Sequence, residues 1–477
     1  MNLRLALLMT ALFPLPALEW SCPIAGAPAA KAEVCTFKYG KEWAYAVEID
    51  DGPKWARPFA VPFLAQHTWT DAPPGVKGGA ERPFVGGIAV IVGAISGSDQ
   101  ALSWADLDAM EQSGWGVINH SLAHNGRSWG DDKGRLSDDQ VREDAFWCQA
   151  MLANGLARKR APTACVYANG YTDYNRGGAL EAVGIRIATR VSGSSPIDVT
   201  SPGVKWMDFN RNYLDEGVWK NDQKGDPMAG IPDAAGAGPK PNSLIIDFTH
   251  GIEQQDSHEN NARWMTRLST IASRWGAGGR DNLWCAPTGE IADYVLAAKV
   301  ATVTCAKGTL TVKLPDGQPG TALTVRLTGV PAAAKLAAPA GGTLHRQGDV
   351  AWLTTPVLGL PGTLPGIPRV KPIYTGEPGL IDLKGSHAIA GIAVRMGGHA
   401  PDGFAYKVVA KTADGDVVVI EAKPDFSHSG GWVNGQVVHP VLPTRAAIQA
   451  TAIDIPRVNE VMREVTIWAI DPAPAAK

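Results

Sequence analysis

The chain has 477 residues and a formal net charge of −3 at pH 7, from 44 basic and 47 acidic side chains. This length is too great for one ordinary hydrophobic core, so two or three domains are expected. The near balance of charge, without a basic block, argues against nucleic acid as the main partner. After the N-terminus no stretch reaches about 18 unbroken apolar residues, so no membrane span is predicted for the rest of the chain.

The N-terminus has the pattern of an export signal. Arg4 supplies a positive start, an apolar core follows at 5–18, and small residues typical of a cleavage region stand at 25–29. The apolar core is too short to span a bilayer as a helix of the mature protein. We therefore predict a signal peptide over 1–29 and an exported protein, either periplasmic or secreted.

The use of cysteine is consistent with export. The chain has six cysteines, and none has the C-x-x-C spacing of a zinc or redox site. An oxidising compartment favours disulfides instead. Pairing of sequence neighbours, Cys148 with Cys165 and Cys285 with Cys305, is the simplest arrangement among several.

Strand and helix patterns alternate between about residues 36 and 302. Ser103 and Ser137 begin capping boxes, and a Pro-Thr pair at 287–288 opens another helix. Such alternation predicts parallel strands joined by crossover helices, in a barrel or an open sheet, and we favour the barrel. Apolar runs predict its strands at 45–49, 88–92, 115–118, 163–167, 185–188 and 244–248.

After about residue 302 the helical signals disappear. Runs rich in β-branched residues, separated by Gly and Pro, predict a small β domain over 303–358. A Gly- and Pro-rich linker follows at 359–368. Residues 369–477 are predicted to form a β-sandwich, with a hairpin turn at 413–416. This sandwich is a candidate carbohydrate-binding module.

Two adjacent carboxylates, Asp50 and Asp51, directly follow the first predicted strand. Neighbouring aspartates repel each other, so such a pair at a strand end indicates a cation or proton that the two share. The alternative is a solvated turn, because Asp, Gly and Pro are ordinary turn residues. The choice depends on whether other polar side chains lie at the same place.

Histidines follow two further predicted strands. His120 and His124 are four residues apart, and His250 ends the strand at 244–248. The carboxyl ends of parallel strands share one edge of the fold, which is where ligands bind. One Asp and two His supply three metal ligands and leave a position open. The other Asp can take a proton and the remaining His can give one, which completes a hydrolytic set.

These motifs resemble those of the polysaccharide deacetylases, carbohydrate esterase family 4. The resemblance rests on Asp50-Asp51-Gly52-Pro53, Asn119-His120-Ser121-Leu122-Ala123-His124 and Phe248-Thr249-His250, in that order, and it covers roughly 36–302. It implies a distorted (β/α)7 barrel that holds one divalent metal ion, with zinc expected. It also implies an acetylated polysaccharide or oligosaccharide as the partner.

The resemblance further implies a role for each motif residue. Asp51, His120 and His124 would be the metal ligands. Asp50 would be the general base that acts on water, and His250 the general acid for the leaving group. The implied reaction removes acetyl groups from a glycan, from either an N-acetyl amide or an O-acetyl ester.

The chain departs from the family at the third motif. The region 166–170 lacks the usual Arg and Pro, so the residue that would orient Asp50 is missing. Arg190 and Arg211 are both candidates to replace it from a neighbouring strand end. The backbone N–H near Asn169 can still donate to an oxyanion, because that role needs no side chain.

Other acidic residues receive plainer interpretations. Glu48 stands in the first strand where many family members carry Thr or Phe. Asp208 and Asp215 lie near Trp206 in the sequence and are candidates for the cleft, but solvated loop carboxylates are the default interpretation.

Alternatives remain for the C-terminal region and for the activity. The sandwich weakly resembles galactose-binding-like modules, and a structural cap on the barrel is an equal alternative. A catalytically weak carbohydrate-binding protein and a hydrolase of a non-sugar amide are the two competing functions.

Overall fold

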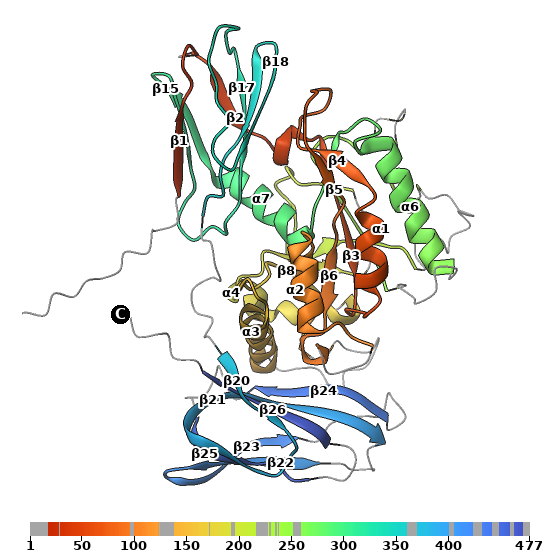
Figure 1. The fold of residues 1–477 in the computed structure, drawn as a ribbon, viewed down its shortest axis with the longest axis vertical. Helices are drawn as coiled ribbons and strands as arrows, with labels where there is room; N and C mark the ends of the chain where they lie inside the picture. The colour runs from red at the N-terminus through yellow and green to blue at the C-terminus, as the bar shows by residue number, and fades with distance from the viewer. Residues whose placement is uncertain are drawn as a thin grey trace, which may run out of the picture.

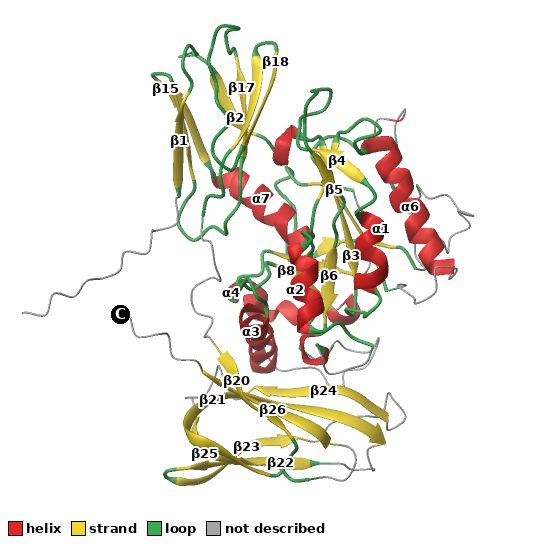
Figure 2. Cartoon of the chain, in the orientation of Figure 1, coloured by secondary structure: helices red, strands yellow, loops and turns green. Residues whose placement is uncertain are grey.

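The computed structural model has three parts along its longest axis: a small β unit, a central α/β barrel and a C-terminal β domain (Figure 1). Figure 2 shows that the long helices belong to the central part. The structure describes residues 18–27, 29–95, 100–122, 124, 138–170, 172–191, 196–215, 228, 230–233, 236, 238–250, 259–359, 370–399, 405–422, 432–440, 448–457 and 462–470.

The central part is built on a parallel sheet in the order β13-β3-β6-β7-β8-β9. Every residue of β3 and β13 is buried, as expected of strands covered on both faces. All six predicted strands are present, and no strand end is shifted by more than two residues. They are β3 (Trp43–Ile49), β6 (Gly87–Val90), β7 (Gly116–Asn119), β8 (Ala164–Val166), β9 (Ile187–Arg190) and β13 (Ser243–Thr249).

A short segment that the sequence pattern did not reveal nearly closes this sheet. β11 (Phe209–Asn210) pairs in parallel with β9, and β12 (Asn212–Tyr213) pairs in parallel with β13. One segment therefore joins the two ends of the sheet, with Arg211 between its two strands. The predicted barrel is thus found as a nearly closed, barrel-like parallel sheet. Two further strands, β10 (Ile197–Asp198) and β14 (Leu283–Cys285), pair with β13 and β3 respectively.

Helices and short elements surround the sheet. The capping box predicted at Ser103 is present, because Ser103 and Asp106 exchange hydrogen bonds at the start of α2. The one predicted at Ser137 lies outside the described residues. The helices are α1 (Val61–Leu64), α2 (Trp104–Gln112), α3 (Asp138–Gly155), α4 (Ala179–Ala182), α6 (Glu259–Trp275) and α7 (Thr288–Val300), and a two-stranded ribbon is formed by β4 (Thr68–Thr70) and β5 (Glu81–Pro83).

The small β unit contains both N-terminal strands as well as residues after the barrel. β1 pairs with β16 and β2 pairs with β17, so this unit extends beyond the predicted 303–358. β1 also lies inside the predicted signal peptide, and Ile24 within that stretch is fully buried. The strands are β1 (Glu19–Pro23), β2 (Lys31–Val34), β15 (Thr302–Ala306), β16 (Thr309–Lys313), β17 (Thr324–Thr328), β18 (Thr343–Gln347) and β19 (Val350–Thr354).

The C-terminal domain is an antiparallel sheet that folds over on itself in two layers (Figure 1). The first half of β21 pairs with β25 and its second half with β24 and β26, so this strand joins the layers. The predicted hairpin joins β22 to β23. The strands are β20 (Val370–Gly376), β21 (Leu380–His399), β22 (Tyr406–Thr412), β23 (Gly415–Ala422), β24 (Trp432–Pro440), β25 (Ile448–Asp454) and β26 (Met462–Ile470).

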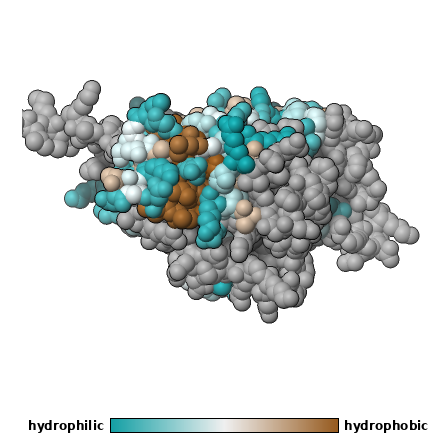
Figure 3. Space-filling view, turned by 90° about the horizontal axis from the view of Figure 1, so that it is seen from below, coloured by the Kyte–Doolittle hydropathy of each residue, from teal (hydrophilic) through white to brown (hydrophobic). Residues whose placement is uncertain are grey.

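Figure 3 views the molecule from the side of this domain and shows hydrophobic side chains gathered among hydrophilic ones. Leu380 and Val418 are exposed side chains of this domain, while a separate core of Ile, Val and Ala side chains fills the space between the layers. The domain is thus a β-sandwich in outline, and the galactose-binding-like resemblance remains a prediction.

All six cysteines are free thiols, so the predicted neighbour pairings are not formed. Cys148 and Cys165 are buried, and their thiols donate to the Asp144 carboxylate and the Val166 carbonyl. Cys285 lies in a barrel strand, whereas Cys305 lies in the small β unit. Among the described helices, none combines the length and the apolar composition needed to cross a bilayer.

Candidate active site

The two adjacent aspartates have different environments. Asp50 continues β3, because its N–H donates to the Thr249 carbonyl at 3.0 Å. Asp51 then adopts a φ of +68°, which turns the chain away from the strand direction. As a result the Asp50 side chain is 1% exposed and the Asp51 side chain is 45% exposed. The two neighbouring carboxylates can therefore have different chemical roles.

Asp51 faces both histidines of the second motif. Its Oδ1 lies 3.2 Å from His120 Nε2 and 3.6 Å from His124 Nε2. One ligand atom from each of the three residues lies within 4.8 Å of the others. Burial raises the pKa of the Asp51 carboxyl, but the neighbouring histidines outweigh burial and bring that pKa to about 2. Burial and the nearby His120 lower the pKa of His124.

The donor atoms of this cluster fit a divalent cation. His120 Nδ1 lies 2.8 Å from the Val166 carbonyl, which makes Nδ1 the protonated nitrogen and leaves a lone pair on Nε2. That Nε2 atom is buried and, apart from the Asp51 carboxylate 3.2 Å away, has no polar partner. An orphaned imidazole nitrogen beside a carboxylate and a second imidazole is the donor set of a three-ligand metal site.

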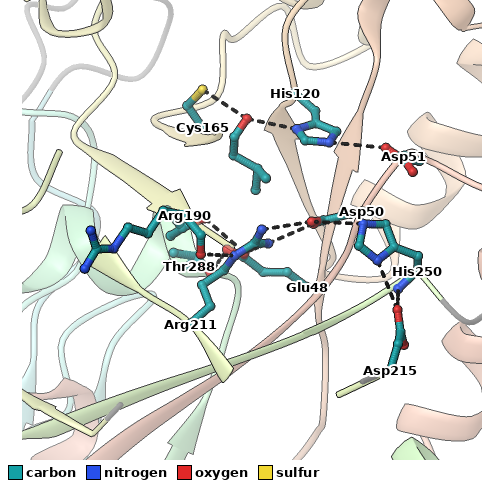
Figure 4. Close-up of polar contacts among 12 residues, drawn as sticks. Glu48, Asp50, Asp51, His120, Cys165, Arg190, Arg211, Asp215, His250 and Thr288 are labelled. Carbon is teal, nitrogen blue, oxygen red and sulfur yellow. Dashed lines mark hydrogen bonds and ion pairs between the residues drawn. The ribbon is translucent and has the colours of Figure 1, made fainter. Parts of the chain in front are cut away.

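Arg211 holds Asp50 in place (Figure 4). Its Nη1 and Nη2 donate to the two carboxylate oxygens of Asp50, at 2.8 and 2.9 Å. Arg211 is itself fully buried, with its Nε bonded to the Arg190 carbonyl and its guanidinium 3.7 Å from the centroid of the Phe248 ring. Burial raises the pKa of Asp50, but the Arg211 charge outweighs burial and the net pKa lies below the ordinary value.

Glu48 is a second carboxylate on the same guanidinium. Its Oε2 accepts from Arg211 Nη1 at 2.9 Å and from the Thr189 hydroxyl, and its Oε1 accepts from the Thr288 hydroxyl. The side chain is fully buried, which raises its pKa, while Arg211 acts in the opposite direction. Glu48, which the two threonines hold in place, is thus a second buried counterion of Arg211.

His250 lies on the other side of Asp50 (Figure 4). Its Nε2 is 3.8 Å from Asp50 Oδ2, and its Nδ1 is 3.0 Å from Asp215 Oδ2. The His250 backbone N–H and the Thr249 hydroxyl also donate to Asp215. Burial lowers the pKa of His250, but the bond to Asp215 and the charge of Asp50 outweigh it, so the net pKa is raised. The same contacts lower the pKa of Asp215 against the effect of burial.

The structure brings five of the six predicted site residues into one cluster, and the sixth lies at the same barrel end. Asn169 is exposed in the turn after β8, the strand that also supplies the Val166 carbonyl. Its φ of +52° orients the turn, and its oxyanion role stays a prediction.

Two further residues were ambiguous or misread in the sequence. Of the two arginines considered, Arg211 contacts Asp50, while Arg190 binds Asn210 and lies 3.2 Å from Asp208. The interpretation of Asp215 as a solvated carboxylate is wrong, because it is bonded to His250. No local sequence pattern marks Arg211 or Asp215 as a site residue. Both reach the site only because the segment that contains β12 pairs with β13.

No protein-family model matches the sequence, and no curated protein matches it. Solved structures are found instead. A deacetylase of Streptococcus pyogenes in complex with acetate is 17% identical, with 35% of this chain and 62% of that chain covered and a TM-score of 0.26. A polysaccharide deacetylase from Bacillus cereus is 18% identical, with 35% and 45% covered and a TM-score of 0.27.

A family 4 acetyl xylan esterase from Clostridium thermocellum, in complex with a cobalt ion, is 14% identical. It covers 52% of this chain and 89% of its own, with a TM-score of 0.29. The chain thus spans 45 to 62% of the length of the first structures that it matches. At these TM-scores the likeness carries no functional conclusion, which has to come from the side chains of the site.

Proposed function

We propose that the protein is a metal-dependent hydrolase that removes acetyl groups from a glycan. One observation carries this proposal: Asp50 and Asp51 are adjacent but have separate partners. Arg211 holds Asp50 with two hydrogen bonds, while Asp51 faces the imidazoles of His120 and His124. A solvated turn needs none of these partners, so the arrangement favours a ligand beside a base.

Asp51, His120 and His124 would hold one divalent cation, with zinc as the expected ion. The orphaned Nε2 of His120 supports this assignment. When bound, such an ion supplies Lewis acidity, which makes water nucleophilic near neutral pH and stabilises negative charge on an acyl oxygen.

Asp50 is suited to take the proton of the attacking water. Arg211 keeps its pKa below the ordinary value, so the carboxylate is ionised and ready to accept a proton at neutral pH. Holding both oxygens in a fork also fixes the orientation of the carboxylate. Asp50 therefore needs no separate rearrangement before it accepts the proton.

His250 is suited to give a proton to the leaving amine or alkoxide. Asp215 accepts from His250 Nδ1, which leaves Nε2 directed at the Asp50 side of the site. The same contact raises the pKa of His250, so the imidazolium persists to higher pH than an ordinary histidine would. The backbone N–H near Asn169 is the proposed donor to the developing oxyanion.

The remaining predictions complete the proposal. The substrate is an acetylated polysaccharide or oligosaccharide, the barrel is of the distorted (β/α)7 type, and the protein is exported to the periplasm or the medium. A galactose-binding-like character of the C-terminal sandwich belongs to the same proposal.

Acetate release tests the reaction. Purified protein is offered acetylated chitooligosaccharides, peptidoglycan and acetylated xylan, and metal content is measured on the same samples. We expect wild type to hold about one divalent ion and to release acetate from at least one substrate. Asp51→Ala should lose both properties, whereas Asp50→Asn should keep the ion and lose release.

Asp198→Asn is the matched control, because Asp198 is an exposed carboxylate whose partner is Thr200. It should leave both properties unchanged. Wild type that holds no metal refutes the proposal. Wild type that binds glycans but releases no acetate from any of them supports a carbohydrate-binding protein instead.

A further inference from the structure

The loop that carries His120 and His124 has an unusual backbone. Ser121 has a φ of +65° and His124 a φ of +52°, a region that residues with a side chain rarely adopt. Such a backbone conformation is strained and persists only where the surrounding structure holds it. Other elements must therefore hold this loop in shape.

Helix α3 is the first element that holds the loop. The Leu122 N–H donates to Asp144 Oδ2 at 3.3 Å, from inside the loop to the helix. The Ser121 N–H donates to Asn119 Oδ1 at 2.9 Å, and Asn119 is itself bonded to Gln149 of α3 at 3.2 Å. Asp144 and Gln149 are both buried, so these contacts are shielded from water.

The turn η3 (Val92–Ala94), which follows β6, is the second element. The Val92 N–H donates to the Ser121 carbonyl at 3.0 Å, and the Gly93 N–H donates to the Leu122 carbonyl at 2.7 Å. The loop is thus bonded to α3 on one side, directly through the Leu122 N–H and indirectly through Asn119 for the Ser121 N–H, and on the other side through its carbonyls to η3.

The C-terminal domain packs on these same two elements. β24 contacts both η3 and α3, and β20 contacts α3 (Figure 1). Ala390 and Trp468 of the domain belong to the core cluster of the barrel, together with the fully buried Trp147 of α3. The approach is so close that a Cβ at Gly391 would lie 2.3 Å from Trp147 Cζ2. Only glycine fits there without displacement.

We propose that the C-terminal β domain is a structural support of the metal-ligand loop, and that its docking on α3 and η3 sets the affinity of the site for a divalent cation. The inference rests on the proposed function, because it concerns the same three ligands. It assigns to the domain a role that does not require sugar binding. Rigid packing under α3 holds Asp144 and Gln149 where they meet the loop.

A steric wedge at the interface tests this in the full-length chain. Gly391→Val places a side chain against Trp147 and suits a strand, since Gly391 does not have a positive φ. We expect the Co2+ dissociation constant, measured by absorption titration, to rise by about 10-fold or more, within the usual range for coupled sites. Gly203→Val is the control, because no atom lies within 4 Å of a Cβ at that exposed position.

A rescue separates docking from general damage. The three atoms nearest the added Cβ are Cζ2, Cη2 and Cε2 of Trp147, all in the six-membered ring of the indole, where the smaller phenylalanine side chain leaves space. Trp147→Phe combined with Gly391→Val should therefore recover most of the Co2+ affinity lost in the single variant. A second core substitution that merely weakened the fold would lower affinity further, and that result would overturn the proposal.

Wild type alone provides a test that does not depend on a variant folding. If docking favours metal binding, metal binding must favour docking by the same factor. Saturating Co2+ should slow amide hydrogen exchange in α3 and in β20 as well as in the loop. Slowing confined to the loop, or unchanged affinity in Gly391→Val, would overturn this inference while leaving the proposed function standing. Wild type that binds no Co2+ overturns both.

Discussion

Arg211 and Asp50 form a buried fork, with two parallel hydrogen bonds of 2.8 and 2.9 Å between guanidinium and carboxylate. The arginine comes from the segment that closes the barrel, far along the chain from the aspartate. Since the region 166–170 offers no arginine, this closure supplies the residue that orients the proposed base.

Replacing Arg211 by Lys should lower the rate of acetate release by about 100-fold while metal content stays unchanged. Lysine keeps the charge but offers a single point donor, so it cannot hold both oxygens of Asp50 in a plane. Steady-state kinetics and metal analysis of the same preparation check this. A loss confined to KM would contradict the orienting role, because orientation of a base affects kcat.

Arg211→Met should destabilise the protein by about 3–5 kcal/mol, because it leaves Glu48 and Asp50 buried without their counterion. Adding Glu48→Gln removes one of the two stranded charges and should recover part of that loss. Urea unfolding of the single and double variants measures both effects. If the loss of unfolding free energy in the double variant equals the sum of the losses in the two single variants, Glu48 is not coupled to Arg211. Its role as a second counterion would then be wrong.

The pH profile of kcat/KM should have its alkaline limb above the ordinary histidine range. The pKa of His250 is raised, and activity needs its protonated form, so activity falls as pH rises through that pKa. Asp215→Asn removes the largest contribution that raises this pKa, while burial still lowers it. The limb should then move to lower pH. If the alkaline limb of Asp215→Asn lies at the same pH as that of wild type, the proton donor is a group other than His250.

A chain that begins after residue 29 should be less stable than one that begins at Leu18. The shorter form lacks β1 and Ile24, whose full burial is worth about 1.5–3 kcal/mol. Thermal unfolding of the two forms checks this. If the protein is exported as proposed, mass spectrometry of its mature N-terminus decides between the predicted cleavage near residue 29 and a start at or before Glu19, which the pairing of β1 and the burial of Ile24 favour. A mature start near residue 30 would contradict the pairing of β1 with β16.

The barrel could be predicted because its evidence is local. Each strand is a short apolar run beside a turn residue, and each motif directly follows such a run, as Asp50 follows β3 and His250 follows β13. The segment around Arg211 carries no such signal, because its strands have two residues each and pair with both ends of the sheet. Asp215 was interpreted wrongly for the same reason, because no residue near it in the sequence indicates that it contacts His250.

The sequence by itself indicated the groups of the proposed chemistry: two adjacent carboxylates and three histidines, all of which follow predicted strands. Only the tertiary structure decided how they are divided into roles. Closure of the barrel brings Arg211 to Asp50, the left-handed turn at Asp51 directs that carboxylate to His120, and Asp215 reaches His250 from a separate segment. These contacts join residues more than 30 positions apart, so they depend on packing that no local pattern encodes.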